Sequence, residues 1–175
     1  MKKSTLLTTL AFAFVMLFSV NSQAQKFAKL DKSPLDIAYF RTNRNAAPMA
    51  KVIYSRPQLN GRALATLAPN GKVWRTGANE ASEIKFYKDS KFGGKDVKAG
   101  TYALYTIPGE KEWTIILSSD TDVWGAYNYK ESNDVLRVKA PVTQGESIEA
   151  FSIAFDNTNM FLAWGTTRVA VPISQ

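Results

Sequence analysis

The residues best suited to contact a ligand lie in the polar stretch from Arg75 to Glu80. This stretch gathers a guanidinium, a hydroxyl, an amide and a carboxylate around Gly77, and Trp74 precedes it. Donors and an acceptor beside an aromatic ring can bind a sugar or a peptide end, because the ring supplies apolar contact while the polar groups fix orientation. A structural interpretation stays open, in which Arg75 pairs with Glu80 and Asn79 caps the turn of a chain crossing between sheets.

A second aromatic group, Trp124, Tyr127 and Tyr129, lies in the connection from Asp120 to Asn133. Alternating aromatic side chains on a long loop are suited to gripping a pyranose ring, so Trp124 and Tyr127 would form walls of one cleft together with Trp74. The alternative is that these rings fill one end of the folded domain, because aromatic side chains bury large areas.

Basic residues are concentrated in the first part of the chain. No acid occurs between Ile37 and Asn79, whereas from Glu80 onward acids outnumber bases. This asymmetry predicts a positive surface that attracts an anionic or carbohydrate envelope ligand, with Arg56 and Arg62 as the attracting charges. The alternative is that the basic segment packs beside the acidic remainder and the charges cancel. The net charge of +7 comes without a nucleic-acid recognition motif, so we expect no nucleic-acid partner.

Catalysis has weaker support than binding. Glu80 with Asp120 or Asp122 could act as the carboxylate pair of a glycoside hydrolase. The 175 residues contain no histidine and no cysteine, which removes the commonest metal ligands, the commonest general base and every disulfide. We assign no catalytic residue, no metal site and no cofactor, and favour a ligand-binding protein over a small carboxylate-dependent hydrolase or an accessory subunit of an envelope assembly. The ligand-binding residues that we predict are Trp74, Arg75, Asn79, Glu80, Trp124, Tyr127, Arg56 and Arg62.

The first 24 residues have the three zones of a secretory signal. Lys2 and Lys3 precede an apolar run from Leu6 to Val20, and a polar stretch then leads to Ala24. This pattern predicts cleavage after Ala24 and an exported protein, periplasmic or secreted, that begins at Gln25. The apolar run is shorter than the ~20 residues that span a bilayer, so we expect no transmembrane segment.

The elements that must position the candidate residues are strands. Apolar and polar residues alternate over short segments from Leu35 to Ile173, and glycine, proline and asparagine separate these segments. The spacing predicts an all-β fold, a single antiparallel β-sandwich or jelly-roll-like domain of nine or ten strands with little helix over residues 25–175. Trp113 and Trp164 lie inside strand patterns, and we expect both in the core.

Two hairpins carry clear turn signals. One is predicted from Thr101 to Ser118, with Pro108 and Gly109 in a type II turn, because proline presets the second turn position and glycine tolerates the positive φ of the third. The other is predicted across Gly165-Thr166, where residues 160–164 would pair with residues 169–173.

Three parts of the sequence are similar to a known family. They are Trp74-Arg75-Thr76-Gly77-Ala78-Asn79-Glu80, the segment from Gly100 to Gly109, and Trp124-Gly125-Ala126-Tyr127-Asn128-Tyr129. With Ser55-Arg56-Pro57, Gly61-Arg62 and Trp113-Thr114-Ile115-Ile116 they resemble domain of unknown function 2911, a family of exported proteins mainly of Bacteroidetes. The resemblance covers nearly all of the mature chain and implies an envelope location and one domain. It supplies no activity.

Overall fold

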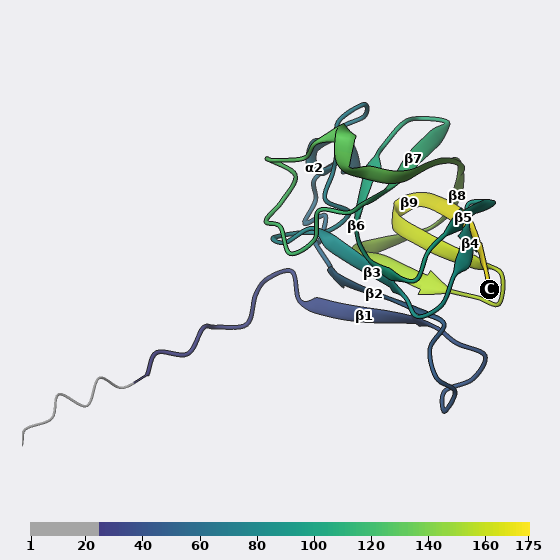
Figure 1. Cartoon of the computed structure of the whole chain (residues 1–175). Coiled ribbons are helices and arrows are strands. Elements are labelled where there is room, and N and C mark those ends of the chain that lie inside the picture. Colours follow the sequence, from purple (N-terminus) through teal and green to yellow (C-terminus); the bar gives the residue numbers. More distant parts are fainter. Residues whose placement is uncertain (1–24) are drawn as a thin grey trace, which may run out of the picture. The chain divides into compact units, whose positions relative to one another are not determined.

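The computed structural model describes residues 25–175 (Figure 1). The predicted signal peptide, residues 1–24, lies outside the described residues. The chain divides into a unit ending at Leu30 and a compact unit from Asp31 to Gln175. Residues 25–30 are exposed and carry no regular secondary structure, whereas the second unit contains every strand of the described part.

The compact unit consists almost entirely of strands. In chain order its elements are β1 (Leu35–Phe40), β2 (Ala50–Ser55), α2 (Leu64–Leu67), β3 (Ser82–Phe86), β4 (Ser90–Phe92), β5 (Lys95–Val97), β6 (Gly100–Ile107), β7 (Glu112–Ser118), the 3-10 helix η1 (Glu131–Asn133), β8 (Asp134–Phe155) and β9 (Asn159–Ser174). Within residues 25–175, no helix has the length and apolar character to cross a membrane.

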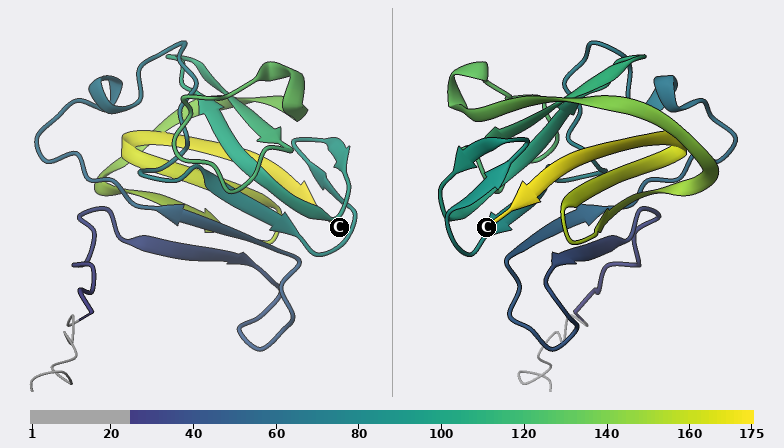
Figure 2. Two further views of the ribbon diagram at one scale, coloured as in Figure 1. Left: turned by 60° about the vertical axis from the view of Figure 1, so that its left-hand side comes forward. Right: turned by 90° about the vertical axis from the view of Figure 1, so that its right-hand side faces the viewer.

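All nine strands belong to one antiparallel sheet, in the order β1-β2-β3-β6-β7-β8-β9-β4-β5. The sheet turns back on itself within β8, a strand of 22 residues. The first part of β8 pairs with β7 and the second part with β9. Figure 2 shows the resulting layers, with β1, β2 and β3 in one and the later parts of β8 and β9 in the other. The predicted all-β, sandwich-like antiparallel fold is confirmed.

The segment that follows β2 closes one side of this sandwich. Gln58 forms an isolated bridge with Ala150, so the chain adds a short piece of ladder to the free edge of β8. The phenol of Tyr54 continues this edge, because it accepts a hydrogen bond from the Ile153 amide (3.0 Å) and donates to the carbonyl of the same residue (3.3 Å). A side chain thereby satisfies backbone groups that would otherwise be buried without partners.

The core between the two layers is rich in aromatic rings. Trp74 stacks on Trp164 at 5.4 Å between centroids and meets Trp113 and Phe151 edge-on at 6.1 and 5.0 Å. The three tryptophans are only 1–6% exposed. Offset stacked and edge-to-face contacts each add about 0.5–1.5 kcal/mol to the burial of the rings. Trp113 and Trp164 occupy the core as predicted.

The Thr101–Ser118 hairpin is confirmed, but its turn is not of type II. β6 pairs with β7 from Ala103↔Ser118 to Ile107↔Thr114. Gly109 does not have the positive φ that a type II turn requires at its third position. Close approach explains the glycine instead, because a Cβ there would lie 2.5 Å from the carbonyl oxygen of Glu112.

The second predicted hairpin, across Gly165-Thr166, is wrong. Residues 159–174 form the single strand β9, and both of its halves pair with β8 rather than with each other. Gly165 has a φ of +53°. A left-handed glycine inside a strand bends the chain without reversing it, so β9 follows the curve of β8. The apolar stretches 136–140 and 151–155 likewise belong to the one strand β8.

Candidate functional site

Two loops, residues 75–80 and 119–130, lie side by side and are called the paired loops below. The Gly125 amide donates to the Asn79 carbonyl at 3.0 Å, and the Ala81 amide donates to the Val123 carbonyl at 2.9 Å. Glu80 and Trp124 form an isolated antiparallel bridge between them. The structure therefore brings together two loops that have 38 residues between them in the sequence.

The first loop is anchored through the buried side chain of Thr76. Its hydroxyl lies 3.3 Å from that of Thr106 on β6, and the Ser82 hydroxyl donates to the Thr76 carbonyl at 2.8 Å. Gly77 lies so close to β2 that a Cβ would come within 3.1 Å of the Ser55 carbonyl oxygen and 2.9 Å of the Ser82 hydroxyl oxygen. The loop is thus pressed against the sheet, and only glycine fits at its centre.

Strained backbone is concentrated in the paired loops. Thr76, Asn79 and Asp122 have φ values of +55°, +62° and +58°. Asparagine and aspartate tolerate this region moderately well, but a β-branched threonine rarely adopts it. Such residues cost of the order of 1–3 kcal/mol each, persist only where their surroundings hold them, and cluster at binding sites and switches. The hydrogen bonds of Thr76 and Ser82 provide that support here.

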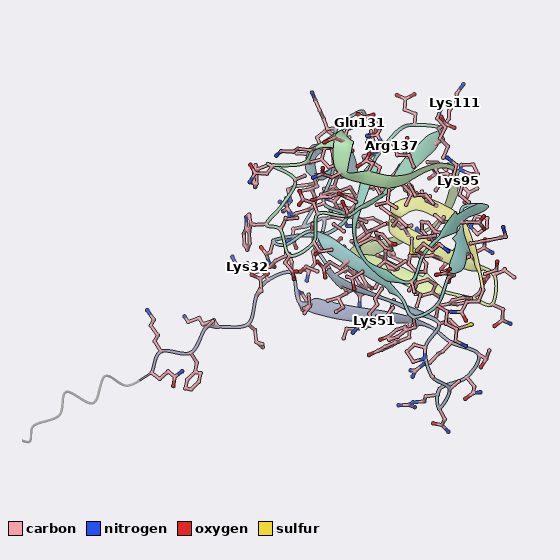
Figure 3. The ribbon with its side chains drawn as sticks, viewed as in Figure 1. Lys32, Lys51, Lys95, Lys111, Glu131 and Arg137 are labelled. Atoms are coloured by element: carbon pink, nitrogen blue, oxygen red, sulfur yellow. The ribbon has the colours of Figure 1, made fainter. Side chains whose placement is uncertain are left out.

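The second loop is anchored on the outer face of the sheet. The ring of Tyr129 packs edge-on against Tyr105 of β6 at 5.1 Å. Its hydroxyl donates to the buried carboxylate of Asp134 and accepts from Arg137, both at 2.7 Å. Arg137 also pairs with Glu131 at 3.0 Å, and Figure 3 shows these two side chains next to each other.

This packing changes how Tyr129 titrates. Burial, together with the hydrogen bond to Asp134, raises the pKa of Tyr129 to about 12. The hydrogen bond that Arg137 donates to the Tyr129 hydroxyl raises the pKa of Arg137 in turn. Near the start of the loop, the Glu83 carboxylate accepts a hydrogen bond from the Asp122 amide at 2.7 Å. The loop is therefore held at both ends, and its middle projects between these anchors.

The projecting part carries two exposed aromatic side chains. Trp124 is 62% exposed and Tyr127 is 81% exposed. Gly125 between them has a φ of +68°, and a Cβ at that position would meet the Tyr127 ring at 2.7 Å. Trp124 and Tyr127 therefore do not fill one end of the domain, contrary to the alternative interpretation. Of the three rings, Tyr129 is the one that packs against the sheet, on Tyr105.

The polar side chains of the first loop differ in their exposure and in their partners. Glu80 is exposed and Asn79 is half-buried. The alternative pairing of Arg75 with Glu80 is not found, since the ion pairs among residues 25–175 do not include either side chain. The Arg75 Nε is buried without a hydrogen-bond partner among these residues.

Three of the predicted ligand-binding residues have structural contacts instead. Trp74 lies in the core, where its amide and carbonyl bond Thr106 of β6 at 2.7 and 2.9 Å and direct the ring inward. Arg56 pairs with Asp36 at 3.1 Å and donates to the Phe151 carbonyl and the Ser152 hydroxyl. Arg62 donates to the carbonyls of Gln58 and Leu59 in its own turn.

A family model described as protein of unknown function (DUF2911) matches residues 36–173. The chain belongs to this family. No curated protein and no solved structure matches it. The matched range of the DUF2911 domain runs from β1 into β9 and includes both paired loops. Since the family description carries no activity, the function of this DUF2911 member has to be argued from its site.

Several residues that shape the site in this DUF2911 domain were missed by the sequence reasoning. Glu83, Asp134 and Arg137 hold the second loop, but each lies in a strand pattern and reads as an ordinary solvated position. Their spacing from Tyr129 or Asp122 has no recognisable signature, because the contacts depend on which strands are neighbours. Of the acids considered for hydrolysis, Asp120 accepts a hydrogen bond from the Asn133 side-chain amide at 3.2 Å. Within the described chain, no cluster of three or more acidic side chains is arranged to hold a metal.

Proposed function

We propose that this protein is an exported envelope protein that binds a carbohydrate ligand at the paired loops without catalysing a reaction. The observation that carries the proposal is the exposure of Trp124, 62% in a protein whose other three tryptophans are 1–6% exposed. An indole ring that stays in water does not gain the large free energy of burial. An exposed ring of this kind is suited to stacking on the apolar face of a sugar.

The rigidity of the paired loops supports the same function. Trp124 is itself bridged to Glu80 and precedes the anchor at Tyr129, so its backbone is fixed before any ligand arrives. A preorganised surface binds more tightly because less conformational entropy is lost on association. The strain at Thr76 and Asp122 is consistent with this reading, since strain persists where a particular loop shape is needed.

Polar groups near the exposed rings can orient a sugar. The Glu80 carboxylate is exposed and can accept hydrogen bonds from sugar hydroxyls, while the Tyr127 hydroxyl and the Trp124 indole N–H can donate. Asn79 adds an amide, half-buried between the loops. A few such groups beside an apolar surface are typical of small-ligand sites.

Export is supported by the N-terminal sequence pattern alone. Fractionation of cells that express the full chain tests it directly. We expect the protein outside the cytoplasm, and N-terminal sequencing of that material should begin at Gln25. Recovery of the intact chain from the cytoplasm contradicts export.

Binding is tested by calorimetry against a panel of envelope and plant polysaccharide fragments, with Trp124→Ala as the main variant. We expect a loss of affinity of about 5- to 150-fold, because stacking of one aromatic ring contributes roughly 1–3 kcal/mol in comparable ring-to-ring contacts. The melting temperature should hardly change, since the ring is already in water. Phe27→Ala removes another exposed aromatic side chain, outside the paired loops, and should bind like the wild type.

Two further variants decide between binding and its alternatives. Arg75→Ala should weaken binding with little change in melting temperature; a large drop in melting temperature would favour a purely structural role for this loop. Release of reducing ends from any fragment, abolished by Glu80→Gln, would show that the protein is a hydrolase and would overturn the proposal.

A further inference from the structure

A groove lies on the outer face of the sheet, on β2, β3 and β6. It encloses about 230 Å3 and is lined by Lys51, Ile53, Glu83, Lys85 and Thr101. These side chains alternate with inward residues such as Val52 and Ile84, which are fully buried. The groove is therefore a surface feature of the sheet, with the core directly beneath it.

The strand register places two lysines directly opposite each other in this groove. Lys51 of β2 is the partner of Lys85 of β3, and Lys85 is in turn the partner of Thr101 of β6. Side chains at such positions have Cβ atoms about 4.5–5.5 Å apart, and like charges there are destabilising.

Two of the three other lysines on the strands of this protein are neutralised, while the third, Lys95 of β5, donates to the Arg137 carbonyl. Lys91 pairs with Asp96, its partner across the β4–β5 ladder, at 2.7 Å, and Lys139 of β8 pairs with Glu112 of β7. Lys51 and Lys85 form no ion pair with any residue in the described chain. The Lys85 ammonium lies over the Tyr87 ring, 5.0 Å from its centroid. Neither lysine is paired with the one carboxylate of the groove, so an anionic ligand would neutralise both.

The third charged residue of the groove, Glu83, limits how much negative charge the ligand can carry. Glu83 lies two residues before Lys85 on the same face of β3, about 7 Å away by the strand rise. Two lysines and one glutamate give the groove a net charge of +1. A single negative charge balances this sum, whereas a doubly charged phosphate would leave an excess beside the Glu83 carboxylate.

The groove also adjoins the paired loops. The carboxylate of Glu83 holds the Asp122 amide at 2.7 Å, and Asp122 is two residues before Trp124. One side chain thus belongs both to the groove wall and to the anchor of the exposed aromatic loop. A chain of several sugars that stacks on Trp124 can continue along β3 toward Lys85.

We infer that Lys51, Lys85 and Thr101 form a subsite for a sugar with a single negative charge, so that the ligand of the paired loops is an acidic polysaccharide. This inference rests on the proposed function. The two ammonium groups bind the acidic group, a uronic-acid carboxylate or a sulfate ester, and the Thr101 hydroxyl donates the third hydrogen bond.

The test is calorimetry with matched oligosaccharides: uronic-acid oligomers of several linkages, their methyl esters, and sulfated galactose oligomers. The wild type should prefer an acidic oligomer over its neutral ester at least tenfold, as expected for charge-assisted hydrogen bonds. Lys51→Gln and Lys85→Gln should each abolish this preference, and added salt should reduce it in the wild type. The melting temperature of both variants should stay equal or rise, because each removes a like-charge contact.

Lys111→Gln is the matched control, since it removes the same charge from an exposed residue far from Lys51 (Figure 3). It should retain the full preference for the acidic oligomer. Preference for the uronate or for the sulfate ester identifies which acidic group the subsite takes.

The remaining outcomes separate this inference from the function beneath it. Equal binding of acid and ester, lost in Trp124→Ala, would overturn the anionic subsite and leave the proposed function intact. Acidic binding that needs both lysines but not Trp124 would support the subsite and contradict binding at the paired loops. An absence of binding to every oligomer would overturn both.

Discussion

The protein contains two sets of tryptophan rings, one buried and one exposed. Trp74, Trp113 and Trp164 form a stacked group between the two layers, whereas Trp124 lies 62% exposed on the paired loops. The inner set is held by packing, because each ring is surrounded by other side chains. The outer ring is held through its backbone, by hydrogen bonds to a neighbouring loop and by anchors at Glu83 and Tyr129. Burial of the ring stabilises the fold in the first case, while an exposed ring leaves a face free for a ligand.

The largest expected effect on the free energy of unfolding comes from a substitution in the inner set. Trp164→Ala should lower the free energy of unfolding by about 3–5 kcal/mol, since it leaves a cavity beside Trp74 and removes the donor to the Glu149 carbonyl (3.0 Å). Trp124→Ala should change it by about 0.5 kcal/mol or less. Denaturant titration followed by far-UV circular dichroism measures both. Equal losses in the two variants would mean that Trp124 also stabilises the fold and would weaken its assignment to a binding site.

The second-largest effect on stability is expected where the first of the paired loops contacts the sheet. Gly77→Ala should lower the free energy of unfolding by about 1–3 kcal/mol, because the new methyl group would press against the Ser55 carbonyl and the Ser82 hydroxyl. Gly145→Ala is the control, since the nearest atoms that a Cβ there would meet belong to the Arg168 side chain, none closer than 3.2 Å. A neutral Gly77→Ala would show that the first loop can lift away from β2, contrary to its description as a fixed support.

The anchor of the second loop should give a smaller and pH-dependent effect. Tyr129→Phe removes the hydroxyl that bonds both Asp134 and Arg137, while these two residues keep their direct ion pair. The loss should cost about 1–2 kcal/mol near neutral pH. Because the pKa of Tyr129 is raised to about 12 in the folded protein, the folded state holds this proton more tightly than the unfolded chain. The stabilisation is therefore complete below pH about 10, the ordinary tyrosine pKa, and is lost as pH rises toward 12.

Unfolding titrations across that alkaline range measure this contribution. The loss of stability with rising pH should be smaller in Tyr129→Phe than in the wild type. Burial also raises the pKa values of Tyr54 and Tyr105, so these residues supply a residual slope of the same sign. Identical slopes in the two proteins would show that the Tyr129 proton does not contribute to folding.

The sequence predicted most of the fold because strand alternation is a local property. The hairpin of β6 and β7 lies where the pattern indicates, and β1 begins at Leu35, where the alternation begins. The failures concern long β8 and β9, where a glycine that looked like a hairpin turn only bends the strand. Turn residues show that the chain changes direction, but the pairing of the segments on either side is decided by distant strands.

For the site, the sequence identified the loops and misjudged some of the side chains. Trp74 was expected at the surface because it precedes a polar string, yet its one bridge to Thr106 turns the ring into the core. Arg56 was expected to attract anions, and Asp36 pairs with it. Arg62 bonds only backbone carbonyls and is exposed, so its attraction of anions stays a prediction. The facing lysines of the groove could not be found from the sequence, since Lys51 and Lys85 become neighbours only through the β2–β3 register.

The smallest expected effect concerns the strain in the loop before Trp124. Asp122→Gly should raise the free energy of unfolding by a few tenths to about 1 kcal/mol, because glycine adopts the φ of +58° without steric conflict. The amide that bonds Glu83 is kept, so the anchor survives. Glycine nevertheless widens the range of loop shapes, and the affinity of a ligand that stacks on Trp124 should fall while stability rises. Opposite changes in the two measurements would indicate that the strained aspartate is retained to fix the outer ring, whereas an unchanged affinity would show that the ring is positioned by the bridge to Glu80 alone.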